Sequence, residues 1–306
     1  MHNKTRPNLD KLLQKTSNNQ NLQPFGPNDK FKNKPVFTID QANKENYAIN
    51  IVKQITQPNK TKIIKGHERY LSNIYAHLKS TYQKNLSAFD PFDHQPSINR
   101  RMRNILFNWL LEVHFKYNLK IRTIFLTANI FERYLQYKRI EREQLQLVGI
   151  TCLLIASKYE DIYPPELRDL YHLCEKTYTI QNFLDCENDI LLHLNFDFVF
   201  VSALDVSELK TKLLNEEDKH IEEVTQVLLH IFLFNSNMSR LDAFKLSDFV
   251  RYYSCRLIKG HCHDIGQLSL DELEAYTLIL KKLLDAIRLD KLYALQSKYK
   301  SSFLSS

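Results

Sequence analysis

One stretch constrains the fold of this chain more than any other: residues 145–165, which read LQLVGITCLLIASKYEDIYPP. From Leu147 to Ala156 every residue is apolar or small, which corresponds to about three helical turns. A helix that is apolar on all sides belongs in the middle of a protein core rather than on its surface. The run ends at Lys158, and a double proline follows closely. The sequence therefore predicts a central buried helix over about 142–160 with a lysine at its end.

The lysine at the end of this helix restricts what can surround it. An isolated ammonium group is costly to bury, so Lys158 either extends its side chain to water or meets a carboxylate. The first alternative is the ordinary one for a long charged side chain. The second would make Lys158 a residue held in place for a partner.

Composition argues against an enzyme. The chain has 306 residues but only five glycines, and neither a GxGxxG nor a GxxxxGK[ST] loop occurs, so a glycine-rich phosphate loop is not indicated. A GxSxG nucleophile elbow is also missing from the sequence. Its five cysteines form no CxxC pair, and the His261–Asp264 cluster lacks a second ligand pair at zinc spacing. We expect no catalysis, no cofactor and no metal.

The charge of the chain is concentrated at one end. The first 60 residues hold ten lysines and arginines against four aspartates and glutamates, whereas the other 246 hold 32 against 31. Eleven asparagines and few large apolar residues accompany this excess, a composition typical of disorder. We therefore predict a disordered basic tail over 1–61. The nearly neutral remainder argues against a nucleic-acid partner, and no apolar run is long enough for a membrane span.

The remainder of the chain shows helical periodicity without the period-two alternation of strands. The predicted helix at about 98–117 carries apolar residues around more of its circumference than one core requires, so it must face two environments. Helix caps are expected at Ser97, Thr179 and Ser202, and Ser269 with Glu272 forms a capping box. Further helices are predicted at about 122–137, 142–160, 165–174, 180–194, 202–214, 217–235, 240–259 and 270–296. The fold class is all-α, with two bundles of similar size.

Four segments together resemble the cyclin family, and the A/B, or mitotic, type most closely. Residues 102–113 read MRNILFNWLLEV and resemble the family's MRAILxDWLxEV segment. Residues 145–149, 156–165 and 177–179 resemble LQLVG, ASKYEExYPP and TYT. The likeness is strong over about 97–200 and faint over 201–300. It implies an N-terminal helix and a first cyclin box within 62–200 and a second, divergent box over 201–306, with five helices in each box.

The resemblance also implies a function. Cyclins are non-catalytic subunits that bind and activate a cyclin-dependent kinase and help recruit its substrates in cell-cycle control, and the A/B type implies mitotic control here. In the family a lysine and a glutamate grip the regulatory helix of the kinase, and the matching positions are Lys158 and Glu187. The expected kinase-binding residues are Lys158, Tyr159, Glu187, Leu191 and Tyr70.

A substrate-docking groove is the second implied site. In the family it is exposed and binds RxL-type peptides of substrates or inhibitors, which would explain the second apolar face of the helix at 98–117. The groove residues expected here are Met102, Ile105, Leu106, Trp109, Glu112, Leu145 and Gln146. A buried structural pair is expected between Arg103 and Glu132, where most members have an aspartate at the second position.

The tail and the second box complete the expectations. Lys44-Glu45-Asn46 matches the KEN motif read by the anaphase-promoting complex, and the resemblance implies a protein of the nucleus and cytoplasm. Bulky residues replace small ones in one helix of the second box, which leaves its packing open. These residues are Phe249, Arg251, Tyr252 and Tyr253. The rival interpretation is a transcription-factor-type cyclin-box module that binds DNA and polymerase.

Overall fold

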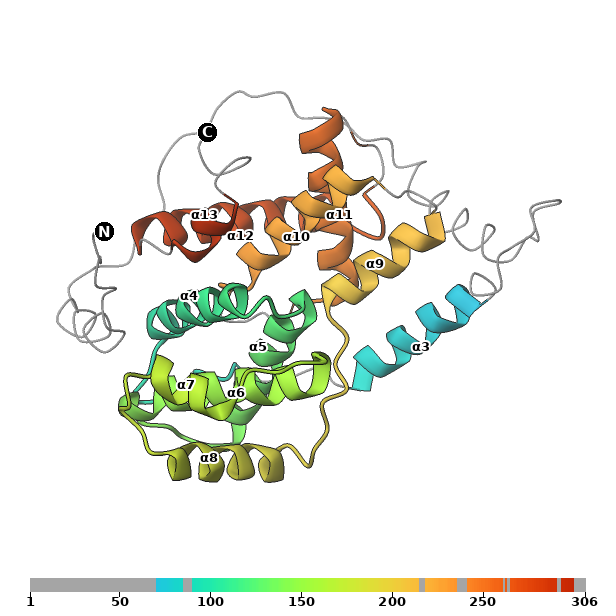
Figure 1. Cartoon of the computed structure of the whole chain (residues 1–306). Helices are drawn as coiled ribbons and strands as arrows, with labels where there is room; N and C mark the ends of the chain where they lie inside the picture. Colours follow the sequence, from blue (N-terminus) through green and yellow to red (C-terminus); the bar gives the residue numbers. More distant parts are fainter. Residues whose placement is uncertain are drawn as a thin grey trace. The chain divides into compact units, whose positions relative to one another are not determined.

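The computed structural model describes residues 70–84, 90–214, 218–235, 241–260, 262, 265–290 and 293–299. The predicted tail and its Lys44-Glu45-Asn46 motif lie outside these residues. Within them all regular structure is helical, which confirms the all-α class (Figure 1). The domain boundaries at 61 and 200 stay predictions.

Five helices form the first bundle, and a short 3-10 helix joins two of them. They are α4 (Arg100–Lys116), α5 (Ile121–Tyr137), η2 (Arg142–Gln144), α6 (Leu145–Glu160), α7 (Leu167–Leu173) and α8 (Ile180–His193). Helix α6 packs against α5, α8 and α4, and its residues from Val148 to Ser157 are buried. This confirms the predicted central helix. Leu106 packs closely on Gly149, where an added Cβ would stand 2.7 Å from a methyl carbon of Leu106.

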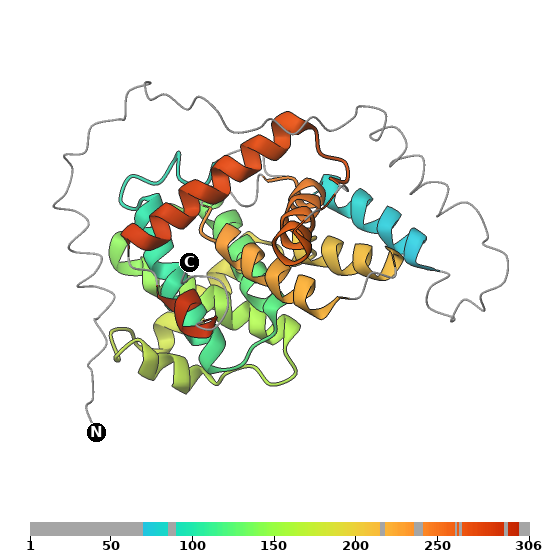
Figure 2. The same cartoon turned by 90° about the horizontal axis from the view of Figure 1, so that it is seen from above.

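Five more helices form the second bundle, and one helix precedes both bundles. The second bundle contains α9 (Ala203–Leu214), α10 (Lys219–Phe232), α11 (Ala243–Lys259), α12 (Leu270–Leu289) and α13 (Ala294–Lys298). The preceding helix, α3 (Leu71–Lys84), lies beside α9 in both views (Figures 1 and 2). The single helix predicted over 270–296 is thus two helices, because α12 ends at Leu289 and Asp290 is its C-cap. No helix of the described residues is long and apolar enough to cross a membrane.

Two predicted helix starts are displaced. Helix α4 is capped by Asn99, whose side chain accepts a hydrogen bond from Met102 N, while Ser97 Oγ instead donates to Glu141. Helix α7 begins after Glu166, so Pro165 precedes the cap and does not occupy the first turn. The other predicted caps are confirmed, at Thr179, at Ser202 and at Ser269 with Glu272.

The bulky residues of the second box are accommodated by aromatic packing. Phe249 is fully buried, and its ring stacks on Tyr276 at a centroid distance of 5.4 Å and on Tyr253 at 5.7 Å. Phe232 meets the same ring edge-on at 5.8 Å. Offset and edge-on aromatic pairs stabilise a core beyond the area that they bury. The aromatic cluster therefore takes the place of the close helix packing that small residues would allow.

The start of α5 is capped from a distant part of the chain. Lys120, its N-cap residue, makes no side-chain cap of its own. Instead the Asp161 carboxylate accepts hydrogen bonds from Lys120 N at 2.9 Å and from Thr123 Oγ1 at 2.6 Å. Asp161 directly follows α6, so this cap fixes the end of α6 that bears Lys158.

We expect Asp161→Ala to lower the free energy of unfolding by about 1–2 kcal/mol, because the first turn of α5 loses its acceptor. Chemical denaturation of the full chain measures this change. Asp93→Ala, at an exposed position of a neighbouring loop, is the control and should change stability by less than about 0.5 kcal/mol. Equal effects of the two substitutions would show that the distant cap is not formed.

Two buried histidines lie where the two bundles meet. His114 of α4 and His230 of α10 have ring centroids 6.4 Å apart, and Lys298 of α13 is near both. Burial lowers the pKa of His114 to about 3, helped by His230 and Lys298, and lowers the pKa of His230 to about 4. Both imidazoles are therefore neutral in the folded chain at neutral pH.

These depressed pKa values predict acid sensitivity. In the unfolded chain both histidines titrate near 6.5, so below that pH the unfolded state binds more protons and the free energy of unfolding falls. We expect a loss of about 2–3 kcal/mol between pH 7.5 and pH 5.5, measured by denaturant unfolding. Replacing both residues, His114→Asn with His230→Asn, should remove most of this dependence, whereas His94→Asn, at an exposed position, should not. An unchanged pH profile in the double variant would contradict the assignment.

Candidate partner-binding site

Lys158 and Glu187 form an ion pair at the molecular surface. Lys158 Nζ lies 2.5 Å from Glu187 Oε1, and the two side chains are 50% and 15% exposed. Both alternatives for the lysine are therefore realised, since it reaches water and also meets a carboxylate. The structure brings the two predicted residues together and leaves the pair accessible.

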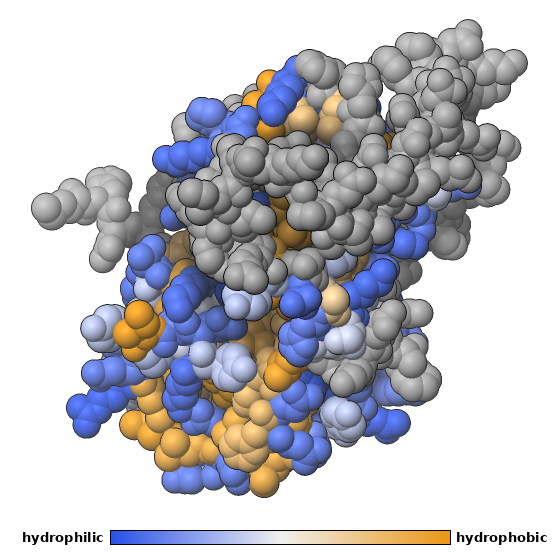
Figure 3. Space-filling view, turned by 90° about the vertical axis from the view of Figure 1, so that its right-hand side faces the viewer, coloured by the Kyte–Doolittle hydropathy of each residue, from blue (hydrophilic) through white to orange (hydrophobic). Residues whose placement is uncertain are grey.

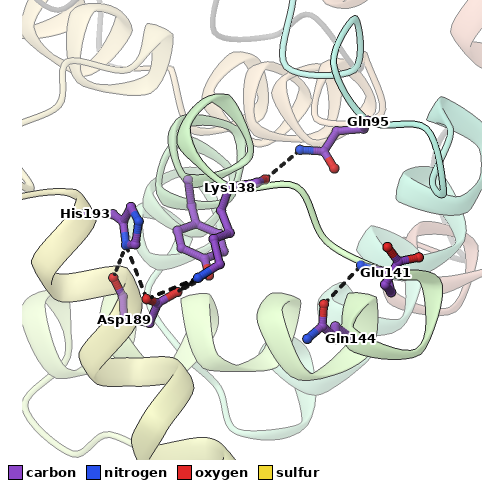
Figure 4. A network of polar contacts seen from close by, with 7 residues as sticks. Gln95, Lys138, Glu141, Gln144, Asp189 and His193 are labelled. Atoms are coloured by element: carbon purple, nitrogen blue, oxygen red, sulfur yellow. Dashed lines mark hydrogen bonds and ion pairs between the residues drawn. The ribbon is translucent and has the colours of Figure 1, made fainter.

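Helix α8 is fixed by a cap at its start and by hydrogen bonds to α5 near its end. Thr179 and Asn182 form a capping box at its start. Nearer its end, the Asp189 carboxylate accepts a hydrogen bond from Lys138 Nζ at 3.1 Å (Figure 4). It accepts another from Tyr134 Oη at 2.5 Å. Burial opposes ionisation of Asp189, but the bonds from Tyr134 and Lys138 outweigh it and lower the pKa of the carboxyl. Asp189 thereby fastens α8 to α5 and fixes the direction of Glu187.

The same network extends to the segment after α5. The Gln95 side chain donates to the Lys138 carbonyl at 2.7 Å (Figure 4). It also accepts a hydrogen bond from Ile140 N at 3.1 Å. A reciprocal pair between Glu141 and Gln144 then begins η2. The connection from α5 to α6 is thus defined by side-chain hydrogen bonds, which fixes where α6 starts.

Exposed apolar side chains accompany the ion pair. Ile180, Leu184 and Leu191 share one face of α8 with Glu187, whereas Phe183 and Ile190 on the other face are buried. Apolar residues also gather at the end of the molecule where α8 lies (Figures 1 and 3). Contiguous exposed apolar surface of this kind marks interaction sites. The large exposed apolar residues of this part of the chain are Tyr159, Ile162, Tyr163, Ile180, Leu184, Leu192, Phe196 and Val199.

Most of these apolar residues were missed from the sequence. Their signal was present in α8, where apolar positions recur on two opposite faces although one core needs only one. Residues Phe196 and Val199 follow the helix, and no periodicity distinguishes them from core residues. Ile162 and Tyr163 are 78% and 88% exposed, and they belong to the segment 145–165 that contains Lys158.

The remaining predicted kinase-binding residues are placed as follows. Tyr159, 56% exposed, packs its ring edge-on against Phe198 at 5.8 Å. Leu191 is partly buried on α8. Tyr70 directly precedes α3 and is 59% exposed. Ile74, one helical turn further on, is 44% exposed. The structure therefore leaves Tyr159 and Tyr70 accessible to a partner.

The predicted docking groove is more closed than the resemblance implied. An exposed apolar groove was expected, but Leu106 and Leu145 are fully buried because α6 packs across α4 at this point. Only Trp109 and Glu112 are partly exposed. The expectation of exposure is thus wrong for Met102, Ile105, Leu106, Leu145 and Gln146. Their role in binding peptides stays a prediction.

Arg103 and Glu132 form the expected buried pair. Arg103 Nη2 lies 2.6 Å from Glu132 Oε1, and the side chains are 0% and 1% exposed. Arg103 also donates from Nη1 to the Leu233 carbonyl at 2.8 Å, and its guanidinium lies 4.1 Å from the centroid of the Phe107 ring. Burial lowers the pKa of the guanidinium, and Glu132 acts in the opposite direction. The longer glutamate therefore still reaches the arginine.

A metal site is not indicated by the described residues, among which no three histidine, cysteine, aspartate or glutamate side chains cluster suitably. Burial raises the pKa of the Cys152 and Cys186 thiols. Raised values make these thiols poor nucleophiles. Around Lys158 the surface presents an ion pair among exposed apolar side chains.

Comparison with known proteins identifies the first bundle. The cyclin N-terminal domain family matches residues 73–199. The chain is 42% identical over 135 residues to the G2/mitotic-specific cyclin S13-6 of Glycine max, covering 44% of this chain and 30% of that protein. It is 34% identical over 191 residues to cyclin-B2-3 of Arabidopsis thaliana, covering 61% and 44%. The matched region thus spans less than half the length of these curated relatives.

A solved structure supports the fold over a wider range. The viral cyclin from herpesvirus saimiri superposes with a TM-score of 0.57 at 20% identity, covering 77% of this chain and 98% of the viral one. This coverage extends beyond the first bundle, so the similarity of fold includes part of the second. Residues 73–199 thus match the cyclin N-terminal domain family, and the similarity to G2/mitotic and B-type cyclins agrees with the resemblance of the chain to A/B-type mitotic cyclins.

Proposed function

We propose that the chain is a non-catalytic regulatory subunit that binds and activates a cyclin-dependent kinase in cell-cycle control. The single observation that carries the proposal is the Lys158–Glu187 pair, formed at 2.5 Å and left accessible among exposed apolar side chains. The similarity to G2/mitotic cyclins over this same domain supports the choice of partner.

The surface is suited to gripping a helix. Apolar side chains of α8 and of the 159–163 segment supply the area that a partner would bury, and the pair supplies charged hydrogen-bonding groups in its middle. Once a partner covers the pair, its charges lie in a poorly hydrated setting where each depends on the other. The kinase is activated if the chain binds its active arrangement more tightly than its inactive one.

The docking surface and the tail are secondary parts of the proposal. RxL-type peptides would bind beside Trp109 and Glu112, the two groove residues that remain partly exposed. Lys44-Glu45-Asn46 would act as a signal for the anaphase-promoting complex in a protein of the nucleus and cytoplasm. Trp109→Ala should weaken the binding of a fluorescent RxL peptide about tenfold, and an unchanged affinity would remove the groove from the account.

Co-elution tests the proposal directly. The full chain is mixed with a purified monomeric cyclin-dependent kinase and analysed by size-exclusion chromatography with light scattering. A one-to-one complex is expected. Lys282→Glu reverses a charge at an exposed position of α12 and should leave the complex intact, which makes it the matched control for Lys158→Glu. If a panel of such kinases gives no complex at micromolar concentration, the proposed function is wrong.

A further inference from the structure

The residues that we propose contact the kinase belong to two separate parts of the fold. Lys158 and Glu187 sit on the first bundle, whereas Tyr70 and Ile74 sit on or next to α3. Helix α3 packs against α9, which belongs to the second bundle (Figures 1 and 2). The distance between the two halves of the surface is therefore set by how the bundles are joined.

Helix α3 is firmly attached to the second bundle. Tyr82 Oη donates to the Leu241 carbonyl at 3.2 Å and accepts from Ala243 N at the same distance. The rings of Tyr75 and Tyr82 meet Phe244 edge-on, with centroids 5.5 Å and 5.6 Å away. Both ring contacts and hydrogen bonds to the backbone attach α3 to the second bundle. We therefore expect the two to move as one body.

Arg103 joins the two bundles in the interior. One arm of its guanidinium holds Glu132 of α5, and the other donates to the carbonyl of Leu233, the residue that caps α10. The side chain is fully buried, so both bonds are protected from water. Other ion pairs between the bundles, such as Arg101 with Asp290, have a partner about half exposed and are worth little.

We infer that Arg103 is a positioning residue for the kinase-binding surface. By holding α10 at a fixed distance from α5, it sets the place of α3 relative to the Lys158–Glu187 pair. Its two arms have separate tasks, since the contact with Glu132 maintains the first bundle and the contact with Leu233 aligns the second. The functional half of this inference rests on the proposed function, and the alignment itself does not.

A double-mutant cycle tests the functional half. Arg103→Lys keeps a cation for Glu132 but loses the forked second bond. In the parent chain, Ile74→Ala and Glu187→Ala should each weaken kinase binding, the former about tenfold. In the Arg103→Lys background, Ile74→Ala should cost less than about twofold, while the cost of Glu187→Ala is unchanged. If both costs are unchanged, or both shrink equally, Arg103 does not position α3 and the inference is overturned.

A measurement without kinase tests the alignment. Spin labels are attached through an introduced ketone-bearing amino acid at the exposed positions Ala76 of α3 and Asn188 of α8, because Cys186, Cys255 and Cys262 would react with thiol labels. Arg103→Lys should broaden or shift the distance distribution. Glu132→Gln, which keeps the Leu233 bond, should leave it close to that of the parent chain. An unchanged distribution in Arg103→Lys overturns the alignment.

The two measurements separate the possible failures. If no kinase binds the parent chain but the label distance shifts, the proposed function fails and the alignment stands. If Arg103→Lys does not fold, the neutral combination Arg103→Met with Glu132→Gln replaces it, because removing both charges avoids an unpaired buried ion. That combination is judged by the same two outcomes, a shifted or an unchanged distance distribution.

Discussion

Lys158→Glu is expected to weaken kinase binding by at least about a hundredfold while leaving the fold almost unchanged. In the free chain the pair is partly exposed, so its loss should cost no more than about 1 kcal/mol of stability. Once a kinase covers the pair, removing one member leaves the other charge desolvated, which costs about 3–5 kcal/mol. Isothermal calorimetry and a melting curve on the same sample measure both effects.

The matched controls for this substitution separate charge from position. Lys282→Glu makes the same charge change on an exposed face of α12 and should leave the affinity unchanged. The exchange Lys158→Glu with Glu187→Lys restores the attraction between the two side chains and should recover part of the lost affinity. A Lys158→Glu chain that binds kinase as tightly as the parent would show that the pair is only a link between α6 and α8.

Glu132→Ala is expected to have the largest effect on stability. It leaves the Arg103 guanidinium in the interior without its counter-charge, and breaking a buried pair in this way costs about 3–5 kcal/mol. The melting temperature should fall on the order of 10 °C for a folded unit of this size. Differential scanning calorimetry of the full chain measures the shift.

A surface pair provides the comparison for Glu132→Ala. Arg122 pairs with Asp205 and Glu208 at the surface, where its own side chain is 43% exposed. Arg122→Ala should therefore cost less than about 1 kcal/mol. Glu132→Gln should be intermediate, because the amide can still accept a hydrogen bond from Arg103. A melting temperature for Glu132→Ala within about 2 °C of the parent would contradict the assigned role of the buried pair.

Much of the first bundle could be predicted because its signals are local. The apolar run from Leu147 to Ala156 allowed only a central helix, and Thr179 has the side chain that caps the next one. The residues themselves left open whether Lys158 reaches water or meets an anion, and Glu187 was expected as its partner only because of the resemblance to the cyclin family. The structure shows that Lys158 has both.

The rest depended on contacts that sequence spacing does not reveal. Asp161 caps α5 from about 40 positions away, at a distance in sequence where no local rule applies. Leu106 is buried because it packs against Gly149 of α6, and this contact closes the expected groove. The second arm of Arg103 reaches Leu233, 130 positions further along the chain. Each is a tertiary contact between elements that were individually predictable.

We propose that this chain activates a kinase through the Lys158–Glu187 pair. The most direct test is the histone-phosphorylating activity of a purified monomeric cyclin-dependent kinase, titrated with the parent chain and with the Lys158→Glu chain. We expect the kinase activity to rise to saturation with the parent chain and to stay near the basal level with the Lys158→Glu chain at the same concentrations. Equal activation by both chains, or activation by neither, would contradict this proposal.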